Sequence, residues 1–392
     1  MLYLLIAGST RANQPVLNCG GPFNKFLDKM TIKAVNEKIS PETISIAILN
    51  TKYLSEVIKL DRNQKAFRLS FIDFSTRSAN QYRLTNGRKA IQKYRSLFDT
   101  IWKKYGIPPE VIVSFWGMET DYGLVQGNFH VLSSLGTLAN DCRRSEFFQS
   151  QYLAAMKLVE NQVLDAEKSL GAWAGEFGQI QMLPLDVLSF GADGDGDGRI
   201  RLADSPQDTI LTAAKLIASK GWAPRQPWFE EVVLPEEFPW YETGLGRSRP
   251  IFEWMKLGVK PVDAQFFLGD RYAETTLILP QGRRGPKFFA YSNFNIFMKW
   301  NNSFVYSTTA AYFANRLMGA YRYRLNGPSD ILDFDQMVGL QKILYELGYD
   351  VGNIDGILGA RTRQAVRKIQ MELNLPADSW PTPELLELLE SL

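Results

Sequence analysis

The sequence predicts a mainly α-helical protein with small β elements, made of one large unit and a small C-terminal unit. Hydrophobic residues make up 45% and charged residues 22% of the 392 positions, which is ordinary for a chain that buries a core. Apolar residues recur with helical periodicity over residues 88–104 and 209–220, whereas residues 275–279 are β-prone. The strongest break is Asn326–Ser329, which reads Asn-Gly-Pro-Ser and separates the two units.

The N-terminal residues predict a segment apart from the large unit. Residues 1–8 form a short apolar run followed by small and polar residues, as in the last part of a secretory signal peptide. An ordinary first helix or strand is the alternative. We therefore expect an N-terminal segment over residues 1–20, a large domain over 21–327 and a small domain over 328–392. No other stretch reaches the ~18 apolar residues that a membrane span needs.

The composition excludes several kinds of chemistry. Lys and Arg total 44 against 42 Asp and Glu, so the net charge of +2 creates no field that favours nucleic acid. One histidine and two cysteines cannot supply the usual ligands of a zinc or iron–sulfur site. Acid–base chemistry is therefore expected from carboxylates. Aromatic residues, at 12%, suit either a core or a groove that stacks sugar rings.

Cys19 and Cys142 are the only cysteines. In an exported protein such a pair favours a disulfide, and two separate buried thiols are the alternative. The closed loop would stabilise the fold by on the order of 4–5 kcal/mol in the chain-entropy description.

One carboxylate stands out on a predicted helix. Pro108, Pro109 and Glu110 are typical of a helix start, and the following residues place Glu119 on the same face as Phe115 and Trp116. Both the apolar face and the negative end of the helix dipole disfavour an ionised side chain. A carboxyl that keeps its proton suits a general acid, whereas pairing with an arginine or exposure at a frayed helix end is the alternative.

The residues around Glu119 resemble the catalytic signature of the MltB-type lytic murein transglycosylases, glycoside hydrolase family 103. The matching blocks follow the family's order and are residues 115–123 (FWGMETDYG), 135–139 (LGTLA), 142–148 (CRRSEFF), 171–184 (GAWAGEFGQIQMLP) and 300–306 (WNNSFVY).

The resemblance implies a lysozyme-like fold with a groove for peptidoglycan. It implies cleavage between N-acetylmuramic acid (MurNAc) and N-acetylglucosamine (GlcNAc), with the muramic 6-hydroxyl attacking C1 to form a 1,6-anhydro end. An internal nucleophile needs only one carboxylate, so Glu119 is expected to act first as acid and then as base, without a cofactor. A hydrolytic muramidase using the same Glu119 and a non-catalytic wall-binding scaffold are the alternatives.

The resemblance also implies a set of substrate-binding residues. Gln181 matches the family's groove glutamine, and Asn301 and Tyr306 match residues near the catalytic glutamate. Arg143 and Arg144 match an arginine pair near the groove, with an ion pair to Glu146 as the alternative. The rival carboxylates are Asp121, expected at the surface or in a cap, and Glu176, expected in a loop. Three positions depart from the family: Ala172 stands for serine, and Leu216 and Trp300 stand for tyrosine.

An acidic loop has the spacing of an EF-hand calcium site. Asp193, Asp195 and Asp197 stand at positions 1, 3 and 5, Gly198 at 6, Arg199 at 7 and Asp204 at 12, with Asp208 as a competing ligand. The spacing predicts a structural Ca²⁺ site, and the resemblance implies a comparable loop in the family. A glycine-rich turn without a cation is the alternative.

Residues 340–386 resemble the peptidoglycan-binding domain type 1, a small three-helix unit. This resemblance implies that a second site tethers the enzyme to its polymer. Together the resemblances imply a monomer in the periplasm of the Gram-negative cell envelope. Its expected partners are peptidoglycan glycan strands, with proteins of cell-wall synthesis or division as further candidates.

Overall fold

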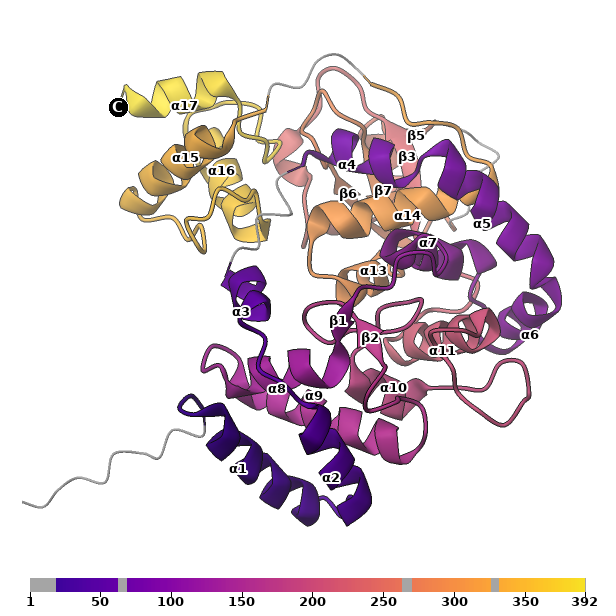
Figure 1. Cartoon of the computed structure of the whole chain (residues 1–392). Coiled ribbons are helices and arrows are strands. Elements are labelled where there is room, and N and C mark those ends of the chain that lie inside the picture. The colour runs from indigo at the N-terminus through magenta and orange to yellow at the C-terminus, as the bar shows by residue number, and fades with distance from the viewer. Residues whose placement is uncertain (1–18, 63–68, 263–269, 326–330, 392) are drawn as a thin grey trace, which may run out of the picture. The chain divides into compact units, whose positions relative to one another are not determined.

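The computed structural model describes residues 19–62, 69–262, 270–325 and 331–391. These residues are mainly helical with short strands, so the predicted fold class is confirmed (Figure 1). The apolar run of residues 1–8 and the break at 326–329 lie outside the described residues, and the predicted domain limits stay a prediction. Contacts divide the chain into two compact units, which are described separately.

The first unit is a helical cluster formed by the described residues 19–62, 128–176 and 183–185. Helices α8 and α9 pack against each other, and α1, α2 and α3 pack on this pair. Strands β1 and β2 form a short antiparallel ladder. The elements are α1 (Phe23–Asn36), α2 (Pro41–Asn50), α3 (Ser55–Arg62), β1 (Phe129–His130), α8 (Val131–Asn140), α9 (Ser145–Glu160), β2 (Leu170–Gly171) and the start of α10 (Pro184–Phe190).

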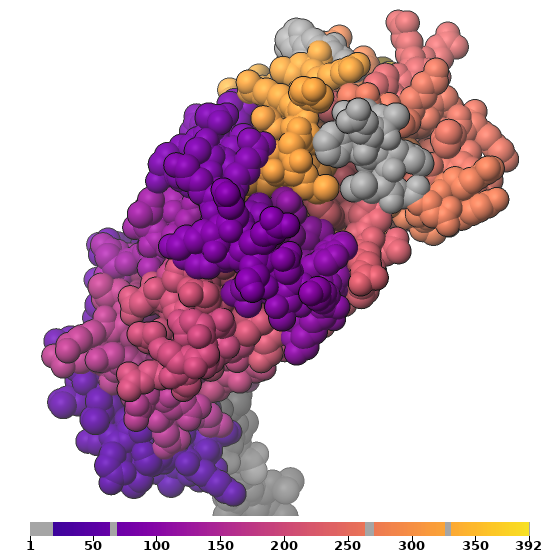
Figure 2. Space-filling model, turned by 90° about the vertical axis from the view of Figure 1, so that its right-hand side faces the viewer, coloured from indigo at the N-terminus to yellow at the C-terminus, as the bar shows by residue number. Residues whose placement is uncertain are grey.

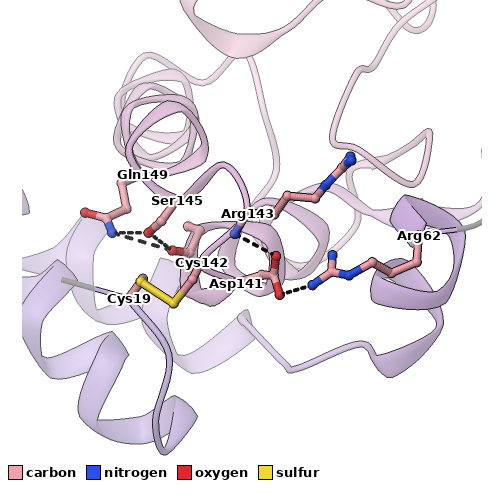
Figure 3. Close-up of a disulfide and its surroundings, with 8 residues drawn as sticks. Cys19, Arg62, Asp141, Cys142, Arg143, Ser145 and Gln149 are labelled. Carbon is pink, nitrogen blue, oxygen red and sulfur yellow. Dashed lines mark hydrogen bonds and ion pairs between the residues drawn. A yellow bond between two sulfur atoms is a disulfide. The ribbon is translucent and has the colours of Figure 1, made fainter. Parts of the chain in front are cut away.

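The expected disulfide joins Cys19 to Cys142, with Cα atoms 5.2 Å apart (Figure 3). Beside it the Gly20 N–H donates to the carbonyl oxygen of Asn140 at 2.6 Å. The disulfide therefore ties the residues before α1 to the turn between α8 and α9.

Helix α7 (Pro109–Thr120) forms the core of the second unit, where it packs against α5, α11 and α14 (Figure 1). Proline at its first position and Glu110 in its first turn confirm the predicted start. The surface around residues 305–325, drawn orange, borders the purple surface of α4 and α5 (Figure 2). The helices of this part are α4 (Phe71–Ser78), α5 (Gln81–Lys93), α6 (Arg95–Tyr105), α11 (Pro206–Ser219), α13 (Phe294–Trp300) and α14 (Phe304–Met318).

The helix predicted over residues 88–104 is interrupted. Tyr94 has φ −105° and ψ 25°, so it ends α5 and directly precedes α6. Its ring lies 6.2 Å from that of Trp116, between ring centroids. Apolar periodicity does not detect this break because residues on both sides keep a buried face.

A five-stranded antiparallel sheet completes the large part of the second unit. Its order is β4-β6-β7-β3-β5, and the β-prone residues 275–279 largely coincide with β6. One side of the sheet contributes to a core that contains Trp254 and Phe289. The elements are β3 (Phe229–Val233), the 3₁₀ helix η2 (Trp240–Glu242), β4 (Ser248–Pro250), α12 (Ile251–Lys256), β5 (Lys260–Pro261), β6 (Glu274–Ile278) and β7 (Phe288–Ala290).

The C-terminal residues form three helices around a core of their own, as predicted. These are α15 (Phe334–Glu346), α16 (Ala360–Glu372) and α17 (Pro383–Glu390), and Leu340, Val366 and Leu386 lie among their buried side chains. Arg363 of α16 is buried and donates to the carbonyl oxygen of Pro280 at 2.7 Å.

Across the four described ranges, none of the helices combines the length and the apolar character that a bilayer crossing requires.

Candidate active site

Glu119 lies near the C-terminal end of α7, a helix whose other faces are nearly all buried. Its side chain is half-buried, whereas Phe115, one turn earlier, is fully buried. The predicted face is therefore formed, and Glu119 projects from apolar surroundings. A carboxyl in such a place needs hydrogen-bond partners from other elements.

Two aromatic side chains supply these hydrogen bonds. The Tyr306 hydroxyl donates to Oε1 of Glu119 at 2.5 Å, and the Trp300 indole N–H donates to the same oxygen at 3.0 Å. Burial, followed by the charge of Glu119, raises the pKa of Tyr306 well above its usual range, so this hydroxyl stays protonated. From the sequence, Trp300 is only an aromatic replacement for a tyrosine and has no predicted role. The signal that could have found it is the N–H donor that tryptophan brings to a tyrosine position.

Asp121, the first of the two carboxylates that could rival Glu119, has a structural role at the C-terminal end of α7. Asp121 and Tyr122 have φ of 51° and 64°, which reverses the chain after the helix. Arg83 donates to both carboxylate oxygens of Asp121, at 2.5 and 3.2 Å. The Tyr122 hydroxyl packs so closely on Gly117 that a Cβ there would lie 2.7 Å away. Asp121 is therefore committed to a bidentate ion pair that fixes the helix end.

Gln181 lies in a loop that is bonded to the end of α7. The Thr120 hydroxyl donates to the carbonyl oxygen of Gln179 at 2.5 Å. Gln181 has φ 50°, and its amide NH₂ donates to the carbonyl oxygens of Gln126 and Gly178 at 3.0 and 2.9 Å. These bonds fix the side chain, which remains partly exposed.

Asn301 shapes the turn that brings Tyr306 to Glu119. Its Oδ1 accepts the Ser303 N–H at 2.9 Å, and its carbonyl oxygen accepts the Ser307 hydroxyl at 2.7 Å. Asn301 also lines a cavity of about 390 Å³ whose wall includes Phe304. The sugar contact expected for Asn301 stays a prediction, and the structure adds this turn-forming role.

Arg143 and Arg144 belong to the first unit, where both bind the buried Asp61. Arg143 donates to its two oxygens at 2.7 Å each, and Arg144 donates at 2.5 Å. Burial acts to raise the pKa of Asp61, but these hydrogen bonds outweigh it and hold the pKa below its usual range. Arg62 and Asp141 extend the cluster beside the disulfide (Figure 3). The arginines thus have a partner other than Glu146, and their role toward substrate stays a prediction.

The remaining rival, Glu176, also lies in the first unit and is partly exposed. Burial raises the pKa of its carboxyl, and the charge of Arg144 opposes that rise. Its carbonyl oxygen accepts the Ala172 N–H at 2.7 Å, which closes the loop between them.

The acidic loop brings three of its predicted ligands together. In the part of the chain that the structure describes, oxygens of Asp193, Asp195 and Asp197 lie within 4.8 Å of one another. Hydrogen bonds from backbone N–H groups, led by that of Gly198, hold the pKa of Asp193 below its usual range. Arg201 forms ion pairs with Asp195 and Asp197.

Asp208 supports the acidic loop, and its predicted role as a competing ligand stays a prediction. It is fully buried, and its two oxygens accept the N–H groups of Gly194 and Arg201 at 2.8 and 2.7 Å. Asp208 therefore holds the backbone of the loop in place, because each of its two oxygens accepts a backbone N–H group. Asp204 lies outside the group of three among the described residues, so its predicted role remains open to test.

With this geometry in place, comparison with known proteins decides the family. Residues 22–315 match the family described as Transglycosylase SLT domain, and residues 335–389 match the Putative peptidoglycan binding domain. The chain belongs to the transglycosylase SLT domain family. It is therefore an enzyme of the lytic transglycosylase class with a lysozyme-like fold, and the muramidase and scaffold alternatives are not favoured.

Individual relatives agree with this assignment. Membrane-bound lytic murein transglycosylase B of Escherichia coli (strain K12) is 26% identical over 308 residues, which cover 74% of this chain and 83% of that protein. SltB3 from Pseudomonas aeruginosa, solved in complex with NAG-anhNAM-pentapeptide, has a TM-score of 0.86 and 32% identity. The match covers 95% of this chain and 100% of that one.

A third relative shares the fold alone. The Escherichia coli lytic transglycosylase Slt35, solved in complex with calcium, has a TM-score of 0.65 and 24% identity. The match covers 78% of this chain and 97% of that chain.

Proposed function

We propose that this lytic transglycosylase cleaves the β-1,4 bond between MurNAc and GlcNAc in peptidoglycan and leaves 1,6-anhydro-MurNAc ends. Glu119 is its acid and then its base. The observation that carries this proposal is the half-buried Glu119 on α7, held by hydrogen bonds from Tyr306 and Trp300. The ligand in the SltB3 complex, which contains anhydro-muramic acid, supports the same class of product.

The reaction needs one proton to move in each direction. Glu119 gives its proton to the glycosidic oxygen while the bond from that oxygen to C1 breaks. The 6-hydroxyl of the same muramic ring then attacks C1 and returns its proton to Glu119, so the atoms balance without water. Because the nucleophile is tethered to the reacting centre, a second carboxylate is not required. Asp121 fits this scheme because its oxygens are bound to Arg83.

Mass spectrometry of digested sacculi tests the proposal. The wild type should release anhydro-muramic ends, and Glu119→Gln should release none above background. Glu110→Gln is the matched control, since it makes the same change in the first turn of the same helix. Reducing muramic ends without anhydro ends would establish a muramidase instead. Sacculus binding without any cleavage would establish a scaffold.

Gln181, Arg143 and Arg144 are proposed to bind substrate because each offers a hydrogen-bonding group or a charge toward it. The NH₂ of Gln181 is already bound to backbone, so its amide oxygen is the group that accepts a sugar hydroxyl. Arg143 and Arg144 carry two positive charges against the single charge of Asp61, which leaves a surplus for the carboxylates of stem peptides. Separate Gln181→Ala and Arg143→Ala variants should raise KM more than they lower kcat, and unchanged KM values would oppose these roles.

The C-terminal helices are proposed to bind the wall polymer and so raise the effective concentration of substrate. Their own buried core supports folding of residues 331–392 apart from the rest of the chain. This fragment should therefore sediment with purified sacculi. A fragment that is folded by circular dichroism yet stays in the supernatant would contradict the proposal.

We also place the protein in the periplasm of a Gram-negative cell, as a monomer acting on glycan strands. The family of peptidoglycan enzymes and the disulfide support this compartment, because disulfides persist where the environment oxidises thiols. Cell fractionation and sedimentation of the purified protein test both statements, and proteins of cell-wall synthesis or division remain the proposed partners to seek by crosslinking.

The acidic loop fits a structural calcium ion. The carboxylates of Asp193, Asp195 and Asp197 already converge, and hard oxygen ligands are what Ca²⁺ prefers. The backbone carbonyl of Arg199 would add a fourth ligand at position 7 of the loop. The ion has no part in the chemistry and would stabilise the loop in place of Arg201. Thermal unfolding should occur at higher temperature with calcium than with chelator, and identical curves would exclude the site.

A further inference from the structure

Glu119 receives its two aromatic donors on the same oxygen atom. Tyr306 and Trp300 both donate to Oε1. The Trp300 ring is stacked on Phe115 with 4.2 Å between ring centroids and an interplanar angle of 18°. Phe115 stands one turn before Glu119 on α7, so the helix that carries the carboxyl also holds the indole in place.

The two donors differ in whether they can also accept a hydrogen bond. A phenolic hydroxyl can donate or accept a hydrogen bond, so Tyr306 alone could pair with either protonation state of Oε1. An indole N–H can only donate. In the carboxylate form Oε1 accepts from both donors. A proton on Oε1 would occupy one of these acceptor positions and leave a hydroxyl oxygen, which is a weaker acceptor for the indole N–H, so protonation on Oε2 is the state that keeps both hydrogen bonds.

We infer that Trp300 is a positioning residue that reserves Oε1 as the acceptor oxygen of Glu119 and thereby assigns the travelling proton to Oε2. Oε2–H then gives its proton to the glycosidic oxygen and takes it back from the 6-hydroxyl of the muramic ring. This inference rests on the proposed function and extends it to the level of single atoms. It also gives the tryptophan at this tyrosine position a chemical reason.

A substitution that removes only the N–H tests the inference. Replacing Trp300 by 3-benzothienylalanine keeps the bicyclic ring and its stacking on Phe115 but puts sulfur where the N–H was. We expect kcat to fall roughly 10-fold, the effect of one hydrogen bond to a charged group, with KM unchanged. The N–H favours the carboxylate form, so its loss should move the alkaline limb of the kcat profile up by about one pH unit.

Two further variants make the outcome decisive. The same analogue at Trp102 of α6 is the matched control and should leave kcat, KM and the pH profile unchanged. Trp300→Phe should reproduce the analogue at position 300, and its effect should not add to that of Tyr306→Phe because both donors share one oxygen. An unmoved pH limb, or a rise in KM that accounts for the whole loss, would reduce Trp300 to packing and overturn the inference.

The proposed function is judged by a separate result. If the wild type forms anhydro ends and Glu119→Gln does not, the proposed function stands whatever the analogue shows. An active Glu119→Gln chain would overturn both.

Discussion

Replacing Cys19 and Cys142 together by serine is expected to destabilise the first unit without changing the second. The disulfide spans 123 positions of sequence and connects the residues before α1 to the turn before α9. Without it the unfolded chain gains conformational freedom, while the folded unit keeps the buried face of α1 and the hydrogen bond from Gly20 to Asn140.

The size of the effect follows from the length of the closed loop. In the chain-entropy description, a loop of this length lowers the entropy of the unfolded state by about 16 cal/mol/K, which is about 5 kcal/mol at 25 °C. For local opening of α1 alone, removal of the disulfide should lower the free energy of opening by less than this, since that opening frees only part of the loop. The loss should therefore grow with the extent of unfolding.

Hydrogen exchange under native conditions separates these levels. Amides of α1 and α9 should exchange faster in the double serine variant, and amides of α14 in the second unit provide the internal control. Adding a reductant to the wild type should reproduce the variant. Unchanged protection in α1, with the disulfide shown to be absent, would refute the reasoning.

Three further predictions concern buried or paired charges. Burial raises the pKa of Glu230 to about 7 from an ordinary 4.5, so the folded state holds a proton that the unfolded chain releases. The free energy of unfolding, measured by denaturant titration at each pH, should then fall by up to about 3 kcal/mol as the pH rises through this interval and level off above it. A Glu230→Gln chain whose free energy of unfolding shows the same dependence on pH would contradict this. Arg363→Met removes a buried donor to two backbone carbonyls and should lower the free energy of unfolding, measured by thermal unfolding, by about 2 kcal/mol. Arg361→Met, an exposed position on the same helix, should change it little. Equal losses in the two variants would exclude the buried contact as the cause. Arg201→Gln removes the two ion pairs with Asp195 and Asp197 and should tighten calcium binding in calorimetry more than Arg199→Gln, which loses the same charge nearby. Equal affinities of the two variants would argue against competition by Arg201.

Local patterns identified the parts of this protein that depend on neighbours in sequence. Proline and an acid at a helix start, followed by apolar residues at helical spacing, located α7 and placed Glu119 on a buried face. The spacing of the aspartates placed Asp193, Asp195 and Asp197 together, because a short loop with glycines leaves their side chains few other directions. Motif order supported the family and the C-terminal helices, and the two cysteines form the disulfide.

The tertiary structure decided which distant side chains meet. Trp300 reaches Glu119 across 181 positions, and Asp61 accepts from Arg143 across 82, and no periodicity carries that information. The same holds for Asp208, whose position in the sequence suits a ligand but whose burial turns both oxygens toward backbone N–H groups. Residue type alone states what each side chain can donate or accept, whereas packing selects the partner, since burial leaves a polar group only the few partners that the fold brings within reach.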